Sequence, residues 1–485
     1  MKYDLKKYQS RVWLIIIIAL VLNYLYAVGT TATNSPFRFD DSVTFLAQFM
    51  DNYLDQDFGS KFDYFFMPAI HPHPKITLRI VSILSYHIFG EINFEGLRYL
   101  TSFCVILFAF GIWYFSNVKS RLLLFIPFVA LLLVPNITNT WVVILGNTIT
   151  SILVMVATHS LIKRRILLAC LCGFLLTFNG PTGMFIFPIG LIILFLLSKT
   201  GNTKVKISDY LIWLGFASFS IWFFVIKVFK REMPEGRNDG SLNLDNLSDI
   251  LGIARMFFDT TFTTLKNAIG IPTIILVLLG APLILYAAYK TYRELLEKNT
   301  TLLIPLTVSF YYLALVGVIS IVSYNSNIDT QTVYTRYECY SNYILSLLGF
   351  IVIYTTKSYT SRDYFKIVVL IIVAIAVQIS GYKNYYTFTG KRVTSAFERR
   401  LRIGIRVESD VKEELETNDI NYSIVRKIAL ENSKETEKQK YWIKEYKNYR
   451  ELLIYREAID KEVYYNSRIY DFDGFIEEYV LFDSY

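Results

Sequence analysis

Charged side chains are scarce in this sequence. Asp, Glu, Lys and Arg make up 19% of its 485 residues, whereas 53% of the residues are apolar. An ordinary soluble domain has about 25% charged residues. The apolar residues form long runs between residues 12 and 380 with hardly a charge inside them. This pattern excludes a string of soluble domains, a disordered chain and a fibrous protein, and it predicts a protein that lies mostly in a lipid bilayer.

Cysteine is also rare, with four residues in the whole chain. Cys104, Cys170 and Cys172 lie inside apolar runs and Cys339 begins another, so no disulfide framework is indicated. On a helix, Cys170 and Cys172 would lie roughly 200° apart around the axis, and one metal ion cannot easily bind both. We therefore interpret the four thiols as structural residues.

Eleven apolar runs are candidates for membrane-spanning helices, although some are so short that ten or twelve spans also fit the pattern. The runs cover residues 12–28, 97–115, 122–135, 141–161, 166–178, 182–197, 207–226, 269–289, 301–322, 340–354 and 367–379. The sequence thus predicts an all-α polytopic membrane protein with about 11 transmembrane helices.

Basic residues indicate how these spans are oriented. Four of them precede the first run between positions 2 and 11, and by the positive-inside rule they keep the N-terminus in the cytoplasm. Every second loop after that carries at least two basic residues, as cytoplasmic loops do. The long segments 29–96 and 227–268 then face the outer side, and so does the chain after the eleventh span.

The last 105 residues, 381–485, differ in composition from the rest. They hold 39 of the 90 charged residues of the chain, 19 basic and 20 acidic. The net charge of +8 therefore comes from short loops before residue 381, so it indicates orientation and not nucleic-acid binding. We predict a transmembrane domain over 1–380 and a soluble extracytoplasmic domain over 381–485, either a small α/β domain or a helical appendage.

The first outer segment, 29–96, contains a further apolar stretch at 76–89. This stretch is too short to cross a bilayer comfortably, and it includes Arg79 and His87. Its apolar residues at positions 76, 80, 83 and 84 recur at helical spacing. They predict an interfacial helix with one face on the membrane and Arg79 near the head groups. The other outer segment, 227–268, mixes charges of both signs and is predicted to be a solvated connection.

Two adjacent carboxylates, Asp40 and Asp41, follow the first span at the outer membrane boundary. Partial desolvation and mutual repulsion would raise the pKa of one of them, which suits a general base. Either residue can instead be the N-cap of a helix over residues 42–54. From these residues alone both interpretations stay open.

Three elements follow the acidic pair in the sequence. They are His71-Pro72-His73-Pro74, then His87-Ile88-Phe89-Gly90, and then Arg98, which opens the next span. An acidic pair followed by an HPPL-like element, an LFG-like turn and an arginine that opens the next span resembles the motif order of the GT-C membrane glycosyltransferases, which include protein O-mannosyltransferases and lipid A aminoarabinose transferases.

Two later stretches also resemble this superfamily. Phe178-Asn179-Gly180-Pro181 looks like its KGP turn between two spans, with asparagine in place of the usual lysine. Tyr334-Thr335-Arg336-Tyr337 looks like its RY element, which faces the lipid-phosphate donor. The motifs are individually weak, but their joint order between about residue 12 and residue 356 is much more specific.

The resemblance implies an inverting glycosyltransferase, similar to the serotype-converting enzymes that modify O-antigen. Such an enzyme moves a sugar, for example glucose, from a polyprenyl-phosphate donor such as an undecaprenyl-phosphate sugar to a lipid-linked glycan at the outer face of the bacterial cytoplasmic membrane. Its partners are this donor, this acceptor and membrane lipids, with no nucleic acid. The implied roles are Asp40 or Asp41 as the base, Arg336, Lys75, Arg79 and Tyr337 at the donor phosphate, and His71 and His73 at the substrate.

Three of the four histidines lie in the first outer segment, so a divalent metal with Asp40 or Asp41 as further ligand is conceivable. Polar residues that shape a turn beside two prolines explain them more simply, and whether a divalent metal cofactor takes part stays open. Two other functions were weighed. A polysaccharide polymerase would more often have an arginine-rich outer loop late in the chain, and a transporter of lipid-linked sugars would bury charges at mid-membrane. The enzyme remains the prediction.

Overall fold

The structure is a computed structural model whose described part is helical throughout and contains no strand. It describes residues 2–34, 46, 48–54, 56–66, 75–90, 94–116, 122–135, 144–229, 247–325, 330–354 and 360–387. The predicted C-terminal domain at 381–485 lies almost entirely outside the described residues, and its predicted boundary falls within the last helix, α16 (Ser361–Thr387).

Eight of the eleven predicted spans coincide with helices that are long and apolar enough to cross a membrane. Besides α16 they are α1 (Lys2–Asn34), α5 (Phe94–Phe115), α7 (Ile144–Ile162), α9 (Ile186–Lys199) with the 3-10 turn η4 (Pro181–Phe185), α10 (Ile207–Phe224), α13 (Thr273–Leu296) and α14 (Leu303–Asn325). The protein is therefore an all-α, multi-pass membrane protein.

The other three predicted spans are shorter apolar helices. They are α6 (Leu122–Leu132), α8 (Ile166–Asn179) and the apolar part of α15 (Thr330–Ile353). α8 ends where Gly180 and Pro181 interrupt the helical backbone, because a proline cannot donate the next helical hydrogen bond. Whether these helices also cross the bilayer stays a prediction.

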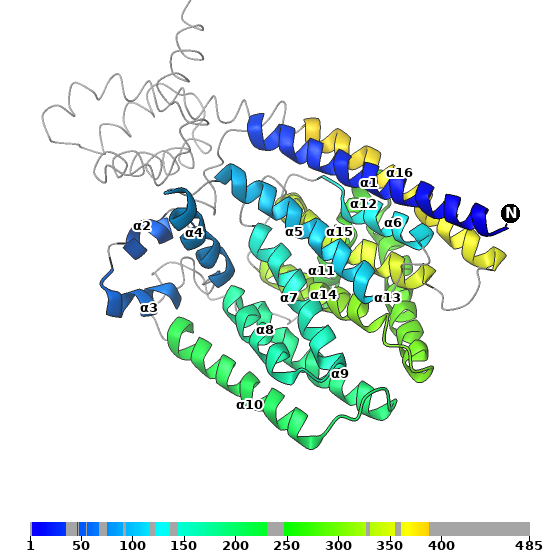
Figure 1. Cartoon of the computed structure of the whole chain (residues 1–485). Helices are drawn as coiled ribbons and strands as arrows, with labels where there is room; N and C mark the ends of the chain where they lie inside the picture. The colour runs from blue at the N-terminus through cyan, green and yellow to red at the C-terminus, as the bar shows by residue number, and fades with distance from the viewer. Residues whose placement is uncertain are drawn as a thin grey trace, which may run out of the picture.

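Helix α15 lies inside the bundle, where α6, α11 (Leu247–Thr261), α13 and α14 pack around it (Figure 1). Every residue from 339 to 351 is buried. A helix surrounded by other helices can carry polar side chains at membrane depth if they find partners. Asn342 does so, since its Nδ2 donates to the carbonyl oxygen of Val134 at 3.3 Å and its Oδ1 accepts from Thr264 at 2.6 Å.

Three of the basic loops that were predicted to be cytoplasmic contact one another at one end of the bundle. Arg164, after α7, forms an ion pair with Asp209 of α10, with a nitrogen–oxygen distance of 3.1 Å. Lys298, after α13, donates to the carbonyl oxygens of Thr200 and Gly201 after α9, at 2.7 and 2.8 Å. Loops that are separated along the sequence thus meet in space, and the side of the membrane that they face stays a prediction.

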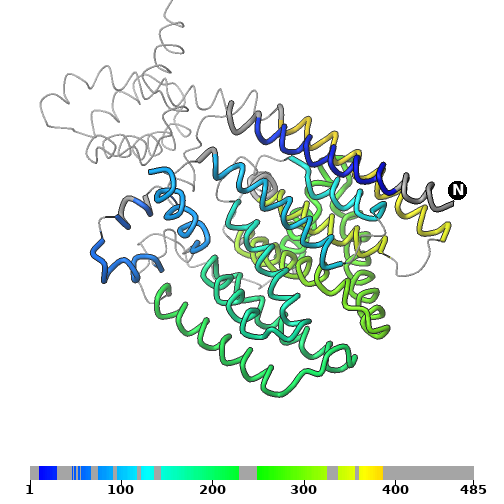
Figure 2. Tube along the Cα trace, viewed as in Figure 1, coloured from blue at the N-terminus to red at the C-terminus, as the bar shows by residue number. Residues whose placement is uncertain are grey.

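Three short helices from the first outer segment pack together at the other end, shown in blue at the side of Figures 1 and 2. They are α2 (Gln48–Leu54), α3 (Phe58–Phe66) and α4 (Ile76–Phe89). The helix predicted over 76–89 is confirmed. Its exposed apolar stripe, however, is Ile80, Leu84 and Ile88, whereas Ile76 and Arg79 are buried against the protein. The prediction that Arg79 lies near head groups is therefore wrong.

The second outer segment is not simply a solvated connection. Residues 230–246 lie outside the described part, but α11 and α12 (Thr263–Ile269) pack against α13, α14, α15 and α16. Thr264 illustrates this packing, because its backbone N–H donates to the Ser341 hydroxyl of α15 at 3.2 Å. The mixed charges that made the segment look like a loop pair with one another, as Asp259 and Lys266 do at 2.8 Å.

Candidate functional site

Of the predicted site residues, the structure describes the side chains of Lys75, Arg79 and Tyr337. Arg336 is placed only as a position in the second turn of α15. The predicted residues Asp40, Asp41, His71 and His73 lie outside the described residues, so their roles stay predictions. Within the described ranges no group of three or more His, Cys, Asp or Glu side chains is arranged to hold a metal ion.

Lys75 precedes α4 in an unusual backbone conformation. Its φ and ψ angles are 52° and 46°, in the left-handed region that non-glycine residues rarely adopt. Its carbonyl oxygen accepts the N–H groups of Leu78 and Arg79 at 2.9 and 3.2 Å, which starts the helix. Left-handed residues of this kind occur often at functional sites. The predicted HPPL-like element thus leads directly into a sharply turned helix start.

Arg79 holds the first outer segment together. Its Nη1 donates to the carbonyl oxygens of Tyr64 and Phe65 at the end of α3, at 3.0 and 2.6 Å. Its guanidinium carbon lies 4.5 Å from the ring centroid of Phe49 in α2. Burial lowers the pKa of Arg79 to about 10, so the group remains charged at neutral pH. One residue of α4 therefore bridges α2 and α3.

Asn179, in the turn that resembles KGP, connects α4 to the transmembrane helices. Its Oδ1 accepts the hydroxyl of Thr77 at 2.6 Å. Its Nδ2 donates to the carbonyl oxygen of Gly146 at 2.8 Å and to the Thr150 hydroxyl at 2.5 Å. Gly146 lets these groups approach closely, because a Cβ would make a tight contact with Leu78 at 3.3 Å and would touch Asn179 and Thr77 at 3.5 Å. Four buried polar groups from α4, α7 and α8 are thus mutually satisfied.

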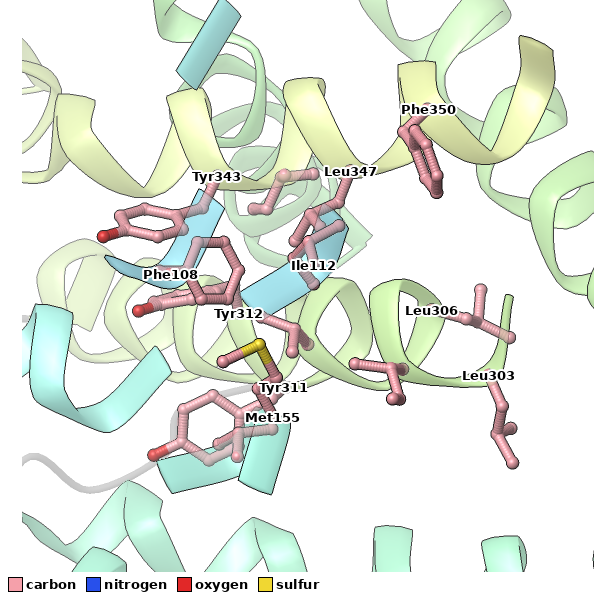
Figure 3. Packing of buried hydrophobic residues seen from close by; sticks show 14 of the residues in the cluster. Phe108, Ile112, Met155, Leu303, Leu306, Tyr311, Tyr312, Tyr343, Leu347 and Phe350 are labelled. Atoms are coloured by element: carbon pink, nitrogen blue, oxygen red, sulfur yellow. The ribbon is translucent and has the colours of Figure 1, made fainter. Parts of the chain in front are cut away.

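Further residues of α7, Asn147 and Ser151, form hydrogen bonds with α14. The hydroxyl of Tyr312 donates to the carbonyl oxygen of Asn147 at 3.0 Å and also bonds Ser151. Figure 3 shows that the hydroxyls of Tyr311, Tyr312 and Tyr343 point to the same side of the core. The Tyr343 hydroxyl is buried and has no hydrogen-bond partner among the described residues. The first turns of α7 therefore have polar neighbours on two sides.

Stacked tyrosine rings extend from this point to the RY-like element. The Tyr312 ring lies 5.3 Å from that of Tyr340, and the Tyr340 ring lies 5.6 Å from that of Tyr337. The Tyr343 ring also stacks on that of Tyr312, with the ring centroids 5.1 Å apart. Rigid aromatic stacking holds the start of α15, where Arg336 stands, at the end of the bundle to which α4 is bonded.

The structure thus brings α4, the turn that resembles KGP and the start of α15 to one end of the bundle, but it does not join all the predicted ligands. Arg79 contacts α2 and α3, whereas the Tyr337 ring stacks on Tyr340 in α15. Sequence reasoning missed Thr77, Thr150 and Tyr312. A signal existed for α7, since Gly146-Asn147-Thr148 and Thr150-Ser151 are unusually polar for a membrane span.

Comparison of the chain with protein-family models, with curated proteins and with solved structures gives no match.

Proposed function

We propose that this protein is a GT-C-type glycosyltransferase that moves a hexose from a polyprenyl-phosphate donor to a lipid-linked glycan at the outer face of the membrane. The observation that carries the proposal is the 2.6 Å hydrogen bond between Thr77 and Asn179. It links the helix after the HPPL-like element to the KGP-like turn, 102 residues later in the chain. This bond supports the proposal that two motifs recognised separately in the sequence belong to one site.

The position of the RY-like element gives further support. Arg336 lies at the start of α15, and this helix start is tied through Tyr340 and Tyr312 to α7, the same helix that Asn179 contacts. A guanidinium at the end of a membrane helix can bind phosphate oxygens bidentately. Arg336 is therefore the proposed ligand of the donor phosphate, with Lys75 at the start of α4 as the second cation.

The proposed reaction is a single displacement. A hydroxyl oxygen of the acceptor attacks the anomeric carbon of the donor sugar, and Asp40 or Asp41 takes the hydroxyl proton. The bond between the anomeric carbon and the phosphate oxygen breaks, and its electron pair leaves with the polyprenyl phosphate. Arg336 stabilises the negative charge on this leaving group. The configuration at the anomeric carbon is inverted.

In this proposal Arg79 positions the helices around it and does not bind the donor phosphate. Its Nη1 is bonded to two carbonyl oxygens and its side chain is 1% exposed. By holding α2 and α3 on α4, it would fix the outer segment that carries Asp40, Asp41 and the two histidines. Its effect on catalysis is then one of position.

The test is transfer by the purified full-length protein in lipid vesicles, with a panel of radiolabelled undecaprenyl-phosphate sugars and extracted glycan acceptors. Asp40→Asn, Asp41→Asn and Arg336→Gln are compared with the unmodified protein. Asp57→Asn is the matched control, because Asp57 is an exposed carboxylate of the same outer segment. Parallel reactions with EDTA, Mg²⁺ or Mn²⁺ determine whether a divalent ion takes part.

We expect one donor to be consumed, with turnover lost in one of the two aspartate variants and in Arg336→Gln, and retained in Asp57→Asn. Removing a catalytic base typically costs a factor of about 10²–10⁴ in rate. Joining of repeat units without a sugar-phosphate donor would instead identify a polymerase. Movement of lipid-linked sugars across the vesicle membrane without transfer would identify a transporter. Either result would overturn the proposal.

A further inference from the structure

Helix α11 carries an arginine that is exposed beside apolar side chains. The side chain of Arg255 is 73% exposed. Ile250 and Leu251, one turn earlier on α11, are 50% and 61% exposed. The opposite side of α11 packs on α13, α14 and α15, which include two of the candidate membrane spans. Arg255 therefore faces outward from the bundle among residues that suit contact with lipid chains.

The ends of two neighbouring spans indicate how deep Arg255 lies relative to the bilayer. Gly252 faces the ring of Tyr324, the last residue of the candidate span in α14, because a Cβ on this glycine would be 2.3 Å from that ring. Asp259 accepts the hydroxyl of Thr273, the first residue of the candidate span in α13, at 2.7 Å. Arg255 lies between these two contacts, and so close to the bilayer surface, where lipid phosphates are found.

Among the described residues, Arg255 forms one ion pair, and that pair is long. The Asp259 carboxylate is fully buried and lies 2.8 Å from Lys266, which neutralises it at close range. The same carboxylate is 3.9 Å from Nε of Arg255, which is at the limit of an ion pair. Two cations therefore share one buried carboxylate. The outer edge of the Arg255 guanidinium can still bind oxygens of an anion.

We propose that Arg255 binds the phosphate of a membrane lipid whose chain lies along Ile250 and Leu251. A guanidinium presents parallel N–H groups that match two phosphate oxygens, and its stem lies on apolar surface at low cost. The lipid is a phospholipid or a polyprenyl phosphate, since both carry this group. The inference does not depend on the proposed transfer reaction, because binding is measured without turnover.

The experiment is native mass spectrometry of the delipidated full-length protein in detergent, titrated with single lipids. The probes are phosphatidylglycerol and undecaprenyl phosphate, with diacylglycerol and undecaprenol as the matching phosphate-free lipids. Arg255→Gln removes the charge, and Arg255→Lys keeps the charge without the planar fork. Arg293→Gln is the control, because Arg293 is an exposed arginine near the other end of α13.

We expect Arg255→Gln to weaken binding of a phosphate-bearing lipid about tenfold, which corresponds to about 1.4 kcal/mol. Arg255→Lys should lose less, and Arg293→Gln and the phosphate-free lipids should show no change. A loss for undecaprenyl phosphate alone would assign the site to a polyprenyl lipid, and an equal loss for phosphatidylglycerol would assign it to lipid phosphates in general. Affinities unchanged by Arg255→Gln, or lowered equally by Arg293→Gln, would refute the proposal.

Discussion

The hydrogen bond between Thr77 and Asn179 can be tested apart from any activity. Asn179→Ala removes three hydrogen bonds, and Asn179 is only 5% exposed. Thr150 keeps a partner, because its hydroxyl also donates to the carbonyl oxygen of Gly146 at 2.9 Å. The Thr77 hydroxyl loses its acceptor in a buried position.

The expected cost follows from these contacts. Hydrogen bonds between helices in membranes contribute about 0.6–1 kcal/mol each. A buried hydroxyl left without a partner costs about 1–3 kcal/mol. We therefore expect Asn179→Ala to lower the free energy of unfolding by about 3 kcal/mol, and Thr77→Val by about 1–2 kcal/mol.

A double-mutant cycle measures the bond itself. Unfolding by denaturant in detergent micelles is followed for the two single variants and for Thr77→Val/Asn179→Ala. The double variant should be less destabilised than the sum of the singles, by about 1 kcal/mol or more. Hydrogen exchange should also become faster in the first turn of α4. Strictly additive effects, with α4 exchange unchanged, would refute the view that the turn at Asn179 holds α4.

Three further predictions concern residues that hold helices in place. Arg79→Met should speed hydrogen exchange in α3 and lower stability by about 2 kcal/mol, because the Tyr64 and Phe65 carbonyls lose a charged donor; unchanged exchange would contradict this. Gly183→Ala should prevent folding, because the new Cβ would lie 1.8 Å from the backbone oxygen of Leu176. Gly215→Ala is the control, because a Cβ at that position meets no atom within 4 Å, and this variant should unfold like the unmodified protein in a thermal melt. Lys290→Met should lower the melting temperature, since Lys290 donates to the Val352 carbonyl at 2.9 Å, and Lys290→Arg should restore part of it.

Much of the fold could be read from the sequence because membrane helices are specified locally. A run of about 20 apolar residues must form a helix in lipid, where each backbone N–H needs a partner within its own segment. The helix over 76–89 was predicted with its observed bounds, because its apolar spacing and the turn at Gly90 are local signals. Basic loops can also be recognised from composition alone, and Arg164 and Lys298 contact neighbouring loops at one end of the bundle, whereas the orientation that they indicate stays a prediction.

The direction in which Arg79 points was decided by tertiary structure. Helix α4 has apolar residues on several sides, so its sequence does not tell which side faces lipid. The side was set by α2 and α3, whose ring and carbonyl oxygens make burial of the guanidinium favourable. Similarly, the charges at Asp259 and Lys266 suggested a solvated loop, because their pairing with each other is not visible in a linear sequence.

The sequence by itself determined that this protein is helical, lies in a membrane and has basic loops at alternate positions, because each of these properties depends on neighbouring residues along the chain. Tertiary structure decided which polar groups meet. Thr77 and Asn179 are 102 residues apart, and Ser151 and Tyr312 are 161 residues apart. Such contacts depend on how helices cross and on small residues such as Gly146 that let them approach, and no local pattern specifies either one.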